Sequence, residues 1–340
     1  VSGVGQASAG FVVDRFGARP ILWASVVLLM LACLAASVST GYSGMVLAVV
    51  LAGLGNCAFH PVDFTILNQR ISTPRLGYAF SVHGLTGNLG WAAAPVFMMG
   101  ISALTHWRTA YLAAAVLYAG ILALLVLRKD LLLTTPRPKA QPGHSGESDL
   151  AFIRLPVVWW CFAFFLLSTM TLAVIQNFSV PILKAMQNVS LETASMTLTA
   201  YMLCGAVGMF GGGFVAARFP RWSDRVVALC MTAAAVLMAV CASGALGGTG
   251  TLVVLAATGF AVGIGGPSRD LMIKKATPKG ATGRVYGLVY SGLDVGFAIS
   301  PILFGAFMDR GWYAATLLGA ALVLLLSVGA ALGVGKRTAH

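Results

Sequence analysis

Residues 55–95 read GNCAFHPVDFTILNQRISTPRLGYAFSVHGLTGNLGWAAAP, and residues 261–301 repeat their pattern as AVGIGGPSRDLMIKKATPKGATGRVYGLVYSGLDVGFAISP. Pro61 and Pro95 are 34 residues apart, and so are their counterparts Pro267 and Pro301. Each copy consists of an apolar run, a short basic segment and a second, Gly-rich apolar run. The pattern predicts two membrane helices joined by a tight turn on a positively charged side, present twice in the chain.

A second pair of segments extends the repeat to half of the chain. GFVVDRF at residues 10–16 recurs as GFVAARF at residues 213–219, and Trp107 and Trp312 each open an apolar run. The offset between the copies is about 205 residues, which is far longer than the unit of a solenoid protein. Two duplicated halves in an apolar chain are typical of secondary transporters.

Composition places the chain in a membrane. Of its 340 residues 58% are hydrophobic and 9% are charged, whereas about one quarter of a soluble domain is charged. Closely spaced apolar runs of about 20 residues indicate an all-α integral membrane protein rather than a barrel of alternating strands. The net charge of +12 is explained by basic cytoplasmic loops, so we expect no nucleic-acid partner.

Ten apolar runs are long enough to cross a bilayer, at residues 20–39, 43–69, 77–103, 109–127, 155–180, 192–217, 226–246, 250–273, 284–308 and 312–334. Residues 1–13 would span only part of it, so we expect the first helix and part of the second to be absent. We divide the chain into an N-terminal half (1–127), a linker (128–154), a C-terminal half (155–334) and a tail (335–340). Lys and Arg concentrate in alternate loops, which predicts that the linker and the tail are cytoplasmic.

GFVVDRFGARP at residues 10–20 resembles a loop signature of the major facilitator superfamily of transporters. The matching positions are Gly10, Asp14, Arg15, Gly17 and Arg19, whereas Ala18 departs from the usual basic residue and the second copy lacks the acid. Phe59-His60-Pro61 locally resembles efflux carriers of the fosmidomycin-resistance type. The resemblance implies two pseudo-symmetric six-helix halves that move one small solute by alternating access, many members being proton-coupled.

Asp294 is the first candidate for proton coupling, because an acid near the membrane midplane is costly unless it has a function. Its repeat counterpart is the uncharged Asn88. The alternative is a packing hydrogen bond with Tyr290 or Ser291. His60 and His83 are further candidates, since imidazole titrates near neutrality, although a membrane histidine also serves as a packing residue.

Three charged residues occupy equivalent places before the two basic segments. Asp63 and Arg269 each follow a repeat proline by two residues, and Asp270 comes next. Asp63 and Arg269 could pair across the halves, gate the path or hold a substrate; the alternative is that they extend to the cytoplasmic surface. By resemblance, Gln176 and Asn177 would face the solute cavity.

The signature residues have a different expected role. Asp14 with Arg15 and Arg70 would form a cytoplasmic charge cluster, and the resemblance implies that such a cluster latches one conformation. Simple solvation of the loop is the alternative.

The sequence predicts a proton-coupled exporter of a small organic compound in the bacterial inner membrane, acting as a monomer. Uptake of an organic anion held by Arg269 is an alternative, and so is a receptor that keeps the fold without transport. Neither a Ser/His/Asp set nor an H-E-x-x-H motif occurs, so we expect no enzymatic activity. We also expect no cofactor and no metal site, because the cysteines stand singly within apolar segments.

Overall fold

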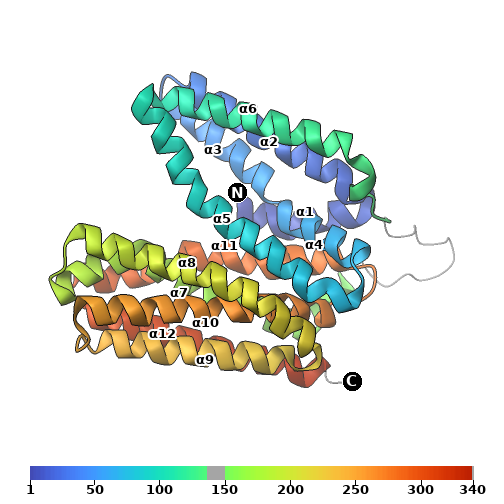
Figure 1. Ribbon diagram of the computed structural model, residues 1–340. Helices are drawn as coiled ribbons and strands as arrows, with labels where there is room; N and C mark the ends of the chain where they lie inside the picture. Colours follow the sequence, from blue (N-terminus) through green and yellow to red (C-terminus); the bar gives the residue numbers. More distant parts are fainter. Residues whose placement is uncertain (136–149, 339–340) are drawn as a thin grey trace. The chain divides into compact units, whose positions relative to one another are not determined.

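The structure is a computed structural model that describes residues 1–135 and 150–338. The described residues form helices and no strands (Figure 1). The predicted linker and tail therefore lie partly outside the described residues. The α-helices are α1 (Ser2–Phe16), α2 (Ala18–Val38), α3 (Tyr42–Asn56), α4 (Phe59–Arg70), α5 (Leu76–Leu104), α6 (Trp107–Leu127), α7 (Pro156–Gln187), α8 (Leu191–Arg218), α9 (Ser223–Ala242), α10 (Gly247–Ala276), α11 (Thr282–Asp309) and α12 (Tyr313–Thr338). Short 3-10 helices are η1 (Thr73–Arg75), η2 (Lys129–Leu132), η3 (Ala151–Arg154) and η4 (Pro220–Trp222).

Ten segments of the described chain are long and apolar enough to cross a membrane. They coincide with the ten predicted runs, and α3 with α4 counts as one segment, Tyr42–Arg70. The prediction of an all-α membrane protein is thus confirmed. Most of residues 1–13, predicted to span only part of the bilayer, lie in α1, which has 15 residues. At the other end, α12 continues to Thr338, so residues 335–338 of the predicted tail are helical.

Local sequence explains where the helices start and stop. Gly17 separates α1 from α2 at a φ of 84°, which residues with a Cβ rarely adopt. Pro156 is the first residue of α7, where its missing N–H costs nothing. Ser190 precedes α8, and its side chain accepts a hydrogen bond from the Thr193 N–H at 3.1 Å, as an N-cap should.

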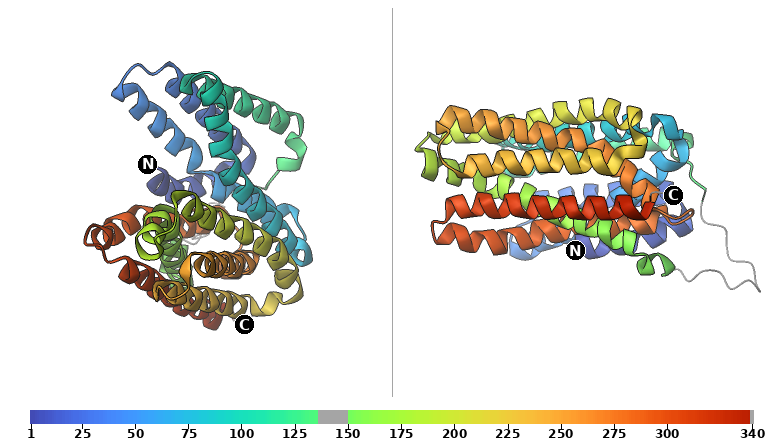
Figure 2. Two further views of the ribbon diagram at one scale, coloured as in Figure 1. Left: turned by 60° about the vertical axis from the view of Figure 1, so that its left-hand side comes forward. Right: turned by 90° about the horizontal axis from the view of Figure 1, so that it is seen from below.

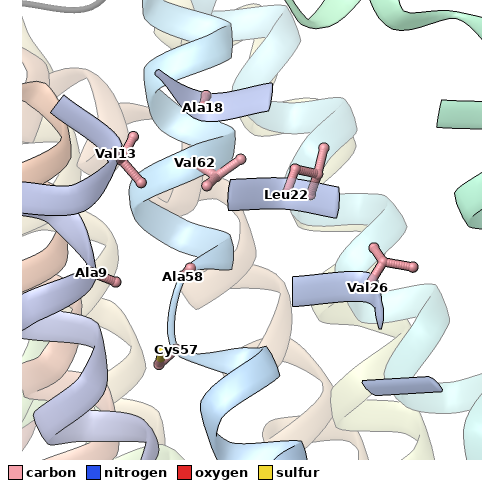
Figure 3. Packing of buried hydrophobic residues seen from close by; sticks show 8 residues of the cluster. All are labelled: Ala9, Val13, Ala18, Leu22, Val26, Cys57, Ala58 and Val62. Carbon is pink, nitrogen blue, oxygen red and sulfur yellow. The ribbon is translucent and has the colours of Figure 1, made fainter. Parts of the chain in front are cut away.

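One predicted helix is interrupted. The turn at Cys57 and Ala58 separates α3 from α4, and Figure 3 shows it beside Val62. Pro61 accounts for it, because its ring clashes with the carbonyl four residues earlier and it has no N–H to donate. Its repeat counterpart Pro267 lies inside the uninterrupted α10, so the two copies differ here.

The contacts of the chain group it into two compact units. Unit 1 comprises Val1–Ser72, the described part of Leu89–Arg154, and Thr277–Ser291. Its buried apolar cluster joins α1, α2 and the start of α4 (Figure 3), and it consists of Ala9, Val13, Ala18, Leu22, Val26, Cys57, Ala58 and Val62. Partly buried residues of α6, among them Tyr118 and Leu122, pack against this cluster.

Unit 2 comprises Thr73–Asn88, Leu155–Ala276 and Gly292–His340. Its helices α7 to α10 and α12 run side by side in both Figure 1 and Figure 2. Helices α8 and α10 are in backbone contact: a Cβ on Gly263 would collide with the carbonyl of Gly205, and one on Gly208 with that of Phe260. Small residues that allow such an approach are typical of membrane helix pairs. The division into sequence halves stays a prediction.

Candidate functional site

Helices α1 and α11 meet within unit 1 at three glycines. A Cβ on Gly10 would collide with the carbonyl of Gly283, and one on Gly287 would lie 2.5 Å from the carbonyl of Gln6. Gln6 is 1% exposed. The approach is therefore possible only without side chains at these positions, which places Asp14, one turn after Gly10, at the first turn of α11.

The Asp14 carboxylate caps α11. It accepts hydrogen bonds from the backbone N–H of Gly283 at 2.8 Å and of Arg284 at 3.2 Å. The Arg284 Nε donates to the same carboxylate at 2.9 Å, and both side chains are nearly buried, at 6% and 9% exposure. An anion at a helix N-terminus is favoured by the unpaired N–H groups and by the helix dipole.

Aromatic rings enclose the cation of this pair. The Arg284 guanidinium lies 5.9 Å from the Phe11 ring centroid and 5.8 Å from that of Phe152. The sequence patterns do not single out Arg284, which pairs with an acid 270 residues away. Its repeat counterpart is Tyr78, so the repeat gives no sign of a charge at that position.

The remaining signature residues make other contacts. Arg15 lies over the ring of Phe16 at 5.3 Å, and Arg19 over that of Trp23 at 5.4 Å. Arg70 donates to the carbonyl of Asp130 at 3.2 Å. The structure thus brings Asp14 to Arg284, whereas Arg15 and Arg70 have other partners. A latch at this place stays a prediction, with Arg284 as the cation.

A repeat-related contact lies within unit 2, between the start of α5 and the end of α8. A Cβ on Gly77 would lie 2.9 Å from the backbone nitrogen of Ala217, and the Ser81 hydroxyl donates to the carbonyl of Met209 at 2.7 Å. Tyr78 packs edge-on against Phe214 with 5.4 Å between ring centroids. Ala217 and Tyr78 occupy the places of Asp14 and Arg284, so this contact is apolar where the other is ionic.

His60 belongs to a stack of four rings in unit 1, formed by α4 and the first half of α11. It stacks on Tyr290 at 4.4 Å between centroids, and Phe64 stacks on Tyr286 at 4.6 Å. Tyr286 and Tyr290 are 0% and 2% exposed. The i, i+4 spacing in both helices makes each pair point the same way. Asp63, between these rings in the sequence, is half-buried.

Arg269 and Asp270 form an ion pair in unit 2. The Arg269 Nε and Nη2 donate to the two Asp270 oxygens at 2.9 and 3.2 Å, a fork geometry that suits guanidinium and carboxylate. The Arg269 side chain remains 28% exposed, and that of Asp270 is 3% exposed. Its guanidinium lies 4.9 Å from the Phe165 ring centroid. A pairing of Arg269 with Asp63, which belongs to unit 1, stays a prediction.

A cavity of about 80 Å³ lies in unit 2, with Arg269 in its wall. Its lining is mostly apolar and aromatic, with hydroxyl groups of Ser168, Thr169 and Thr258 between the rings. The large lining side chains are Phe164, Phe165, Tyr201, Met231 and Met238. The chemistry of this lining suits a small amphipathic molecule.

Asp294 lies near the middle of α11, twelve residues after Thr282 and fifteen before Asp309. It is half-buried, and its Oδ2 atom is buried. Leu293, directly before it, lines the cavity. Gly292 and Gly296 flank it, and a Cβ on either would lie within 3 Å of an α7 carbonyl. The acid is thus on a helix in close contact with the cavity wall.

The other predicted residues lie apart from this cavity wall. Asn88 is exposed, and His83 is half-buried on α5. Gln176 is half-buried, whereas Asn177 is exposed and donates to the carbonyl of Ala173 at 2.8 Å. Among the described residues, His, Cys, Asp and Glu form no group of three or more that could hold a metal ion.

Comparison with known proteins places the fold. The chain is 30% identical over 125 residues to the Multidrug resistance protein B homolog of Mycobacterium tuberculosis. This alignment covers 36% of this chain and 23% of that protein. The matched part thus spans about a quarter of that protein's length.

Solved structures agree over almost the whole chain. The human organic anion transporter TETRAN is similar with a TM-score of 0.79 at 16% identity, over 97% of this chain and 80% of that one. The E. coli fucose:proton symporter FucP is similar with a TM-score of 0.72 at 15% identity, over 99% of this chain and 88% of that one. The sequence profile of the Major Facilitator Superfamily matches residues 1–245 and 169–339. The chain therefore belongs to the Major Facilitator Superfamily of membrane transporters.

Proposed function

We propose that this transporter exports a small amphipathic organic solute in exchange for protons. The observation that carries the proposal is the position of Asp294, an acid near the middle of a membrane helix, next to the cavity-lining Leu293. A carboxyl group held there can change its protonation as hydration changes, and intramembrane acids are typical of proton pathways. We further propose the bacterial inner membrane, a cytoplasmic C-terminus and a monomer.

The cavity supports an amphipathic solute. Aromatic, thioether and aliphatic side chains line most of it, and Met side chains adapt to ligands of different shape. The hydroxyls of Ser168 and Thr258 donate to the carbonyls of Phe164 and Val254. Their oxygens therefore remain as acceptors for a donor on the solute. The name of the mycobacterial relative, a multidrug resistance protein homolog, favours export.

The test compares Asp294→Asn with the parent in proteoliposomes of the intact protein. The probes are ethidium as an aromatic cation, fluorescein as an aromatic anion and N-phenylnaphthylamine as a neutral compound. Asparagine keeps the volume but cannot ionise, so we expect accumulation driven by a pH gradient to be lost while solute counterflow continues. Asp294→Glu should keep part of the accumulation.

Asp309→Asn is the matched control, because Asp309 is the exposed last residue of the same helix. It should accumulate solute like the parent. Equal accumulation by Asp294→Asn and the parent would assign Asp294 to packing and remove proton coupling through it. Binding of a probe with no flux in the parent would support a receptor instead.

Arg269 favours a second candidate, transport of an organic anion. Its side chain is in the cavity wall and stays 28% exposed, and the guanidinium lies beside the Phe165 ring. A cation at this place could meet a carboxylate or sulfonate. Arg269→Gln should then weaken fluorescein binding at least tenfold and leave ethidium binding unchanged. Weaker ethidium binding with unchanged fluorescein binding would exclude an organic anion as the solute.

A further inference from the structure

One end of unit 2 combines basic and aromatic residues that do not line the cavity. The ends of α7, α8, α9, α10 and α12 meet there. We call this surface the basic–aromatic end, and it consists of Trp160, Arg218, Phe219, Arg221, Trp222, Asp224, Arg225, Lys274, Lys275, Lys336 and Arg337. Seven of these residues are basic and one is acidic.

Hydrogen bonds and close packing join the members into one surface. Lys275 Nζ donates to the Ser223 hydroxyl at 2.9 Å and to the carbonyl of Arg221 at 3.3 Å, which joins α10 to the start of α9. The Asp224 carboxylate lies against the backbone of Gly335, which joins α9 to α12. Gly333 lies against the ring of Trp160, which joins α12 to α7.

Three arginines of this surface lie over exposed rings. The Arg225 guanidinium is 4.1 Å from the Trp222 ring centroid, that of Arg337 is 5.4 Å from Trp160, and that of Arg218 is 6.0 Å from Phe219. The rings of Trp222 and Phe219 belong to residues that are 51% and 50% exposed. Such exposure of large aromatic residues is costly in water, but it is typical at the headgroup level of a membrane.

We propose that the basic–aromatic end binds anionic phospholipid headgroups. Guanidinium groups bind phosphate through paired N–H donors, and stacking on an aromatic ring fixes the orientation of each guanidinium. Basic residues directly beside membrane helices attract anionic lipids. The rings would lie at headgroup depth, with the arginines against the phosphates. The excess of positive charge at this end of unit 2 attracts an anionic lipid and repels a cationic partner. The proposal does not depend on the solute or on proton coupling.

The test adds short-chain phosphatidylglycerol or phosphatidylcholine, with identical tails, to the intact protein in a neutral detergent. Tryptophan fluorescence and the midpoint of thermal unfolding report binding. We expect the parent to bind phosphatidylglycerol at least tenfold more tightly, and added salt should weaken that preference. The variant Arg225→Gln with Arg337→Gln should lose about 25-fold in phosphatidylglycerol affinity, since each surface cation accounts for about fivefold.

Two arginines serve as matched controls. Arg108 lies 4.2 Å from the ring centroid of Trp107, and Arg310 lies 5.6 Å from that of Trp312, both outside the basic–aromatic end. Arg108→Gln and Arg310→Gln should leave the lipid preference unchanged. If a double variant does not fold, each single variant is measured, and about a fivefold loss is expected. Unchanged preference in the Arg225 and Arg337 variants, or equal binding of both lipids, would overturn the proposal. Equal protection by inorganic phosphate would also overturn it, because the ligand would then not be a lipid.

Discussion

At the scale of single residues, Asp14 and Arg284 form a pair whose members depend on each other. Three donors converge on one nearly buried carboxylate, and two aromatic rings enclose the cation. Removing one member leaves the other charged and poorly solvated, which is the costly way to break a buried pair.

We therefore expect Asp14→Asn and Arg284→Gln each to lower the free energy of unfolding by about 3 kcal/mol. The double variant should cost clearly less than the sum of the singles. The measurement is a double-mutant cycle, in which the parent, both single variants and the double variant of the intact protein are unfolded in mixed micelles. Arg15→Gln is the control, because Arg15 is exposed on the same helix and should add independently to Asp14→Asn. Additive losses for Asp14 and Arg284 would contradict the pair.

His60 gives a second prediction for a single residue. Its ring stacks on Tyr290 at 4.4 Å, and such pairs contribute about 1 kcal/mol beyond the buried area. His60→Ala should lose at least this much stability, whereas His60→Phe should keep most of it. The same variants in the pH-gradient assay test the proton role: accumulation by His60→Phe equal to the parent would make His60 a stacking residue alone.

The sequence could identify the acidic residue of each candidate site, but it could not identify the cation that pairs with Asp14. Asp14 was visible because it belongs to a signature, and Asp294 because it is an acid in an apolar run. Arg284 lies at the start of an apolar run, in a basic segment where several cations are equivalent by sequence. Only the approach of α1 to α11 distinguishes it, and that approach depends on glycines far apart in the chain.

At the scale of helices, the contact of α8 with α10 leads to a prediction about adjacent glycines. Gly212 faces the backbone of Ile264, whereas nothing lies within 4 Å of a Cβ placed on Gly211. Gly212→Ala should destabilise the protein by about 1–3 kcal/mol, because the backbones must separate. Gly211→Ala should be neutral or slightly stabilising, since alanine favours the helix. Equal effects in thermal unfolding would mean that α8 and α10 do not approach as closely as described.

The interruption between α3 and α4 shows what a repeat pattern cannot tell. Both copies place a proline at the same position, and both predicted runs are of similar length. Only Pro61 separates two helices, whereas Pro267 stays within α10. A proline removes one backbone hydrogen bond of a helix. The packing of neighbouring helices determines whether the helix bends or ends there. Gly263, in contact with α8, is part of that packing in the second copy.

At the scale of the whole molecule, the orientation stays a prediction that reporter fusions can check. The excess of Lys and Arg in alternate loops predicts that a reporter after Lys139 or Lys336 reports cytoplasm. Reporters near Gly41 or Gly248 should report the opposite side. Gly41 lies between two spans, and Gly248 is the second residue of α10. A reporter outside the cytoplasm at residue 139 would contradict the assigned topology.

The number and limits of the spans were predictable because they depend on local composition and length. All ten runs correspond to helices of the structure, usually within a few residues. The cavity in unit 2 was not predictable, since its lining residues come from six helices and look like ordinary apolar positions one by one. Periodic apolar runs define a helix, but they do not tell which faces meet.

The two repeat-related contacts differ in the residues that each copy of the repeat supplies. Asp14 lies in the first copy, and its counterpart Ala217 carries no charge. Asp14 needs Arg284, which only the second half supplies. Neither copy of the repeat could therefore form the ion pair from residues of its own, since Tyr78 stands in the place of Arg284 and Ala217 in the place of Asp14. Arg284→Tyr, which places the residue of the first copy at this position, would leave Asp14 without its cation.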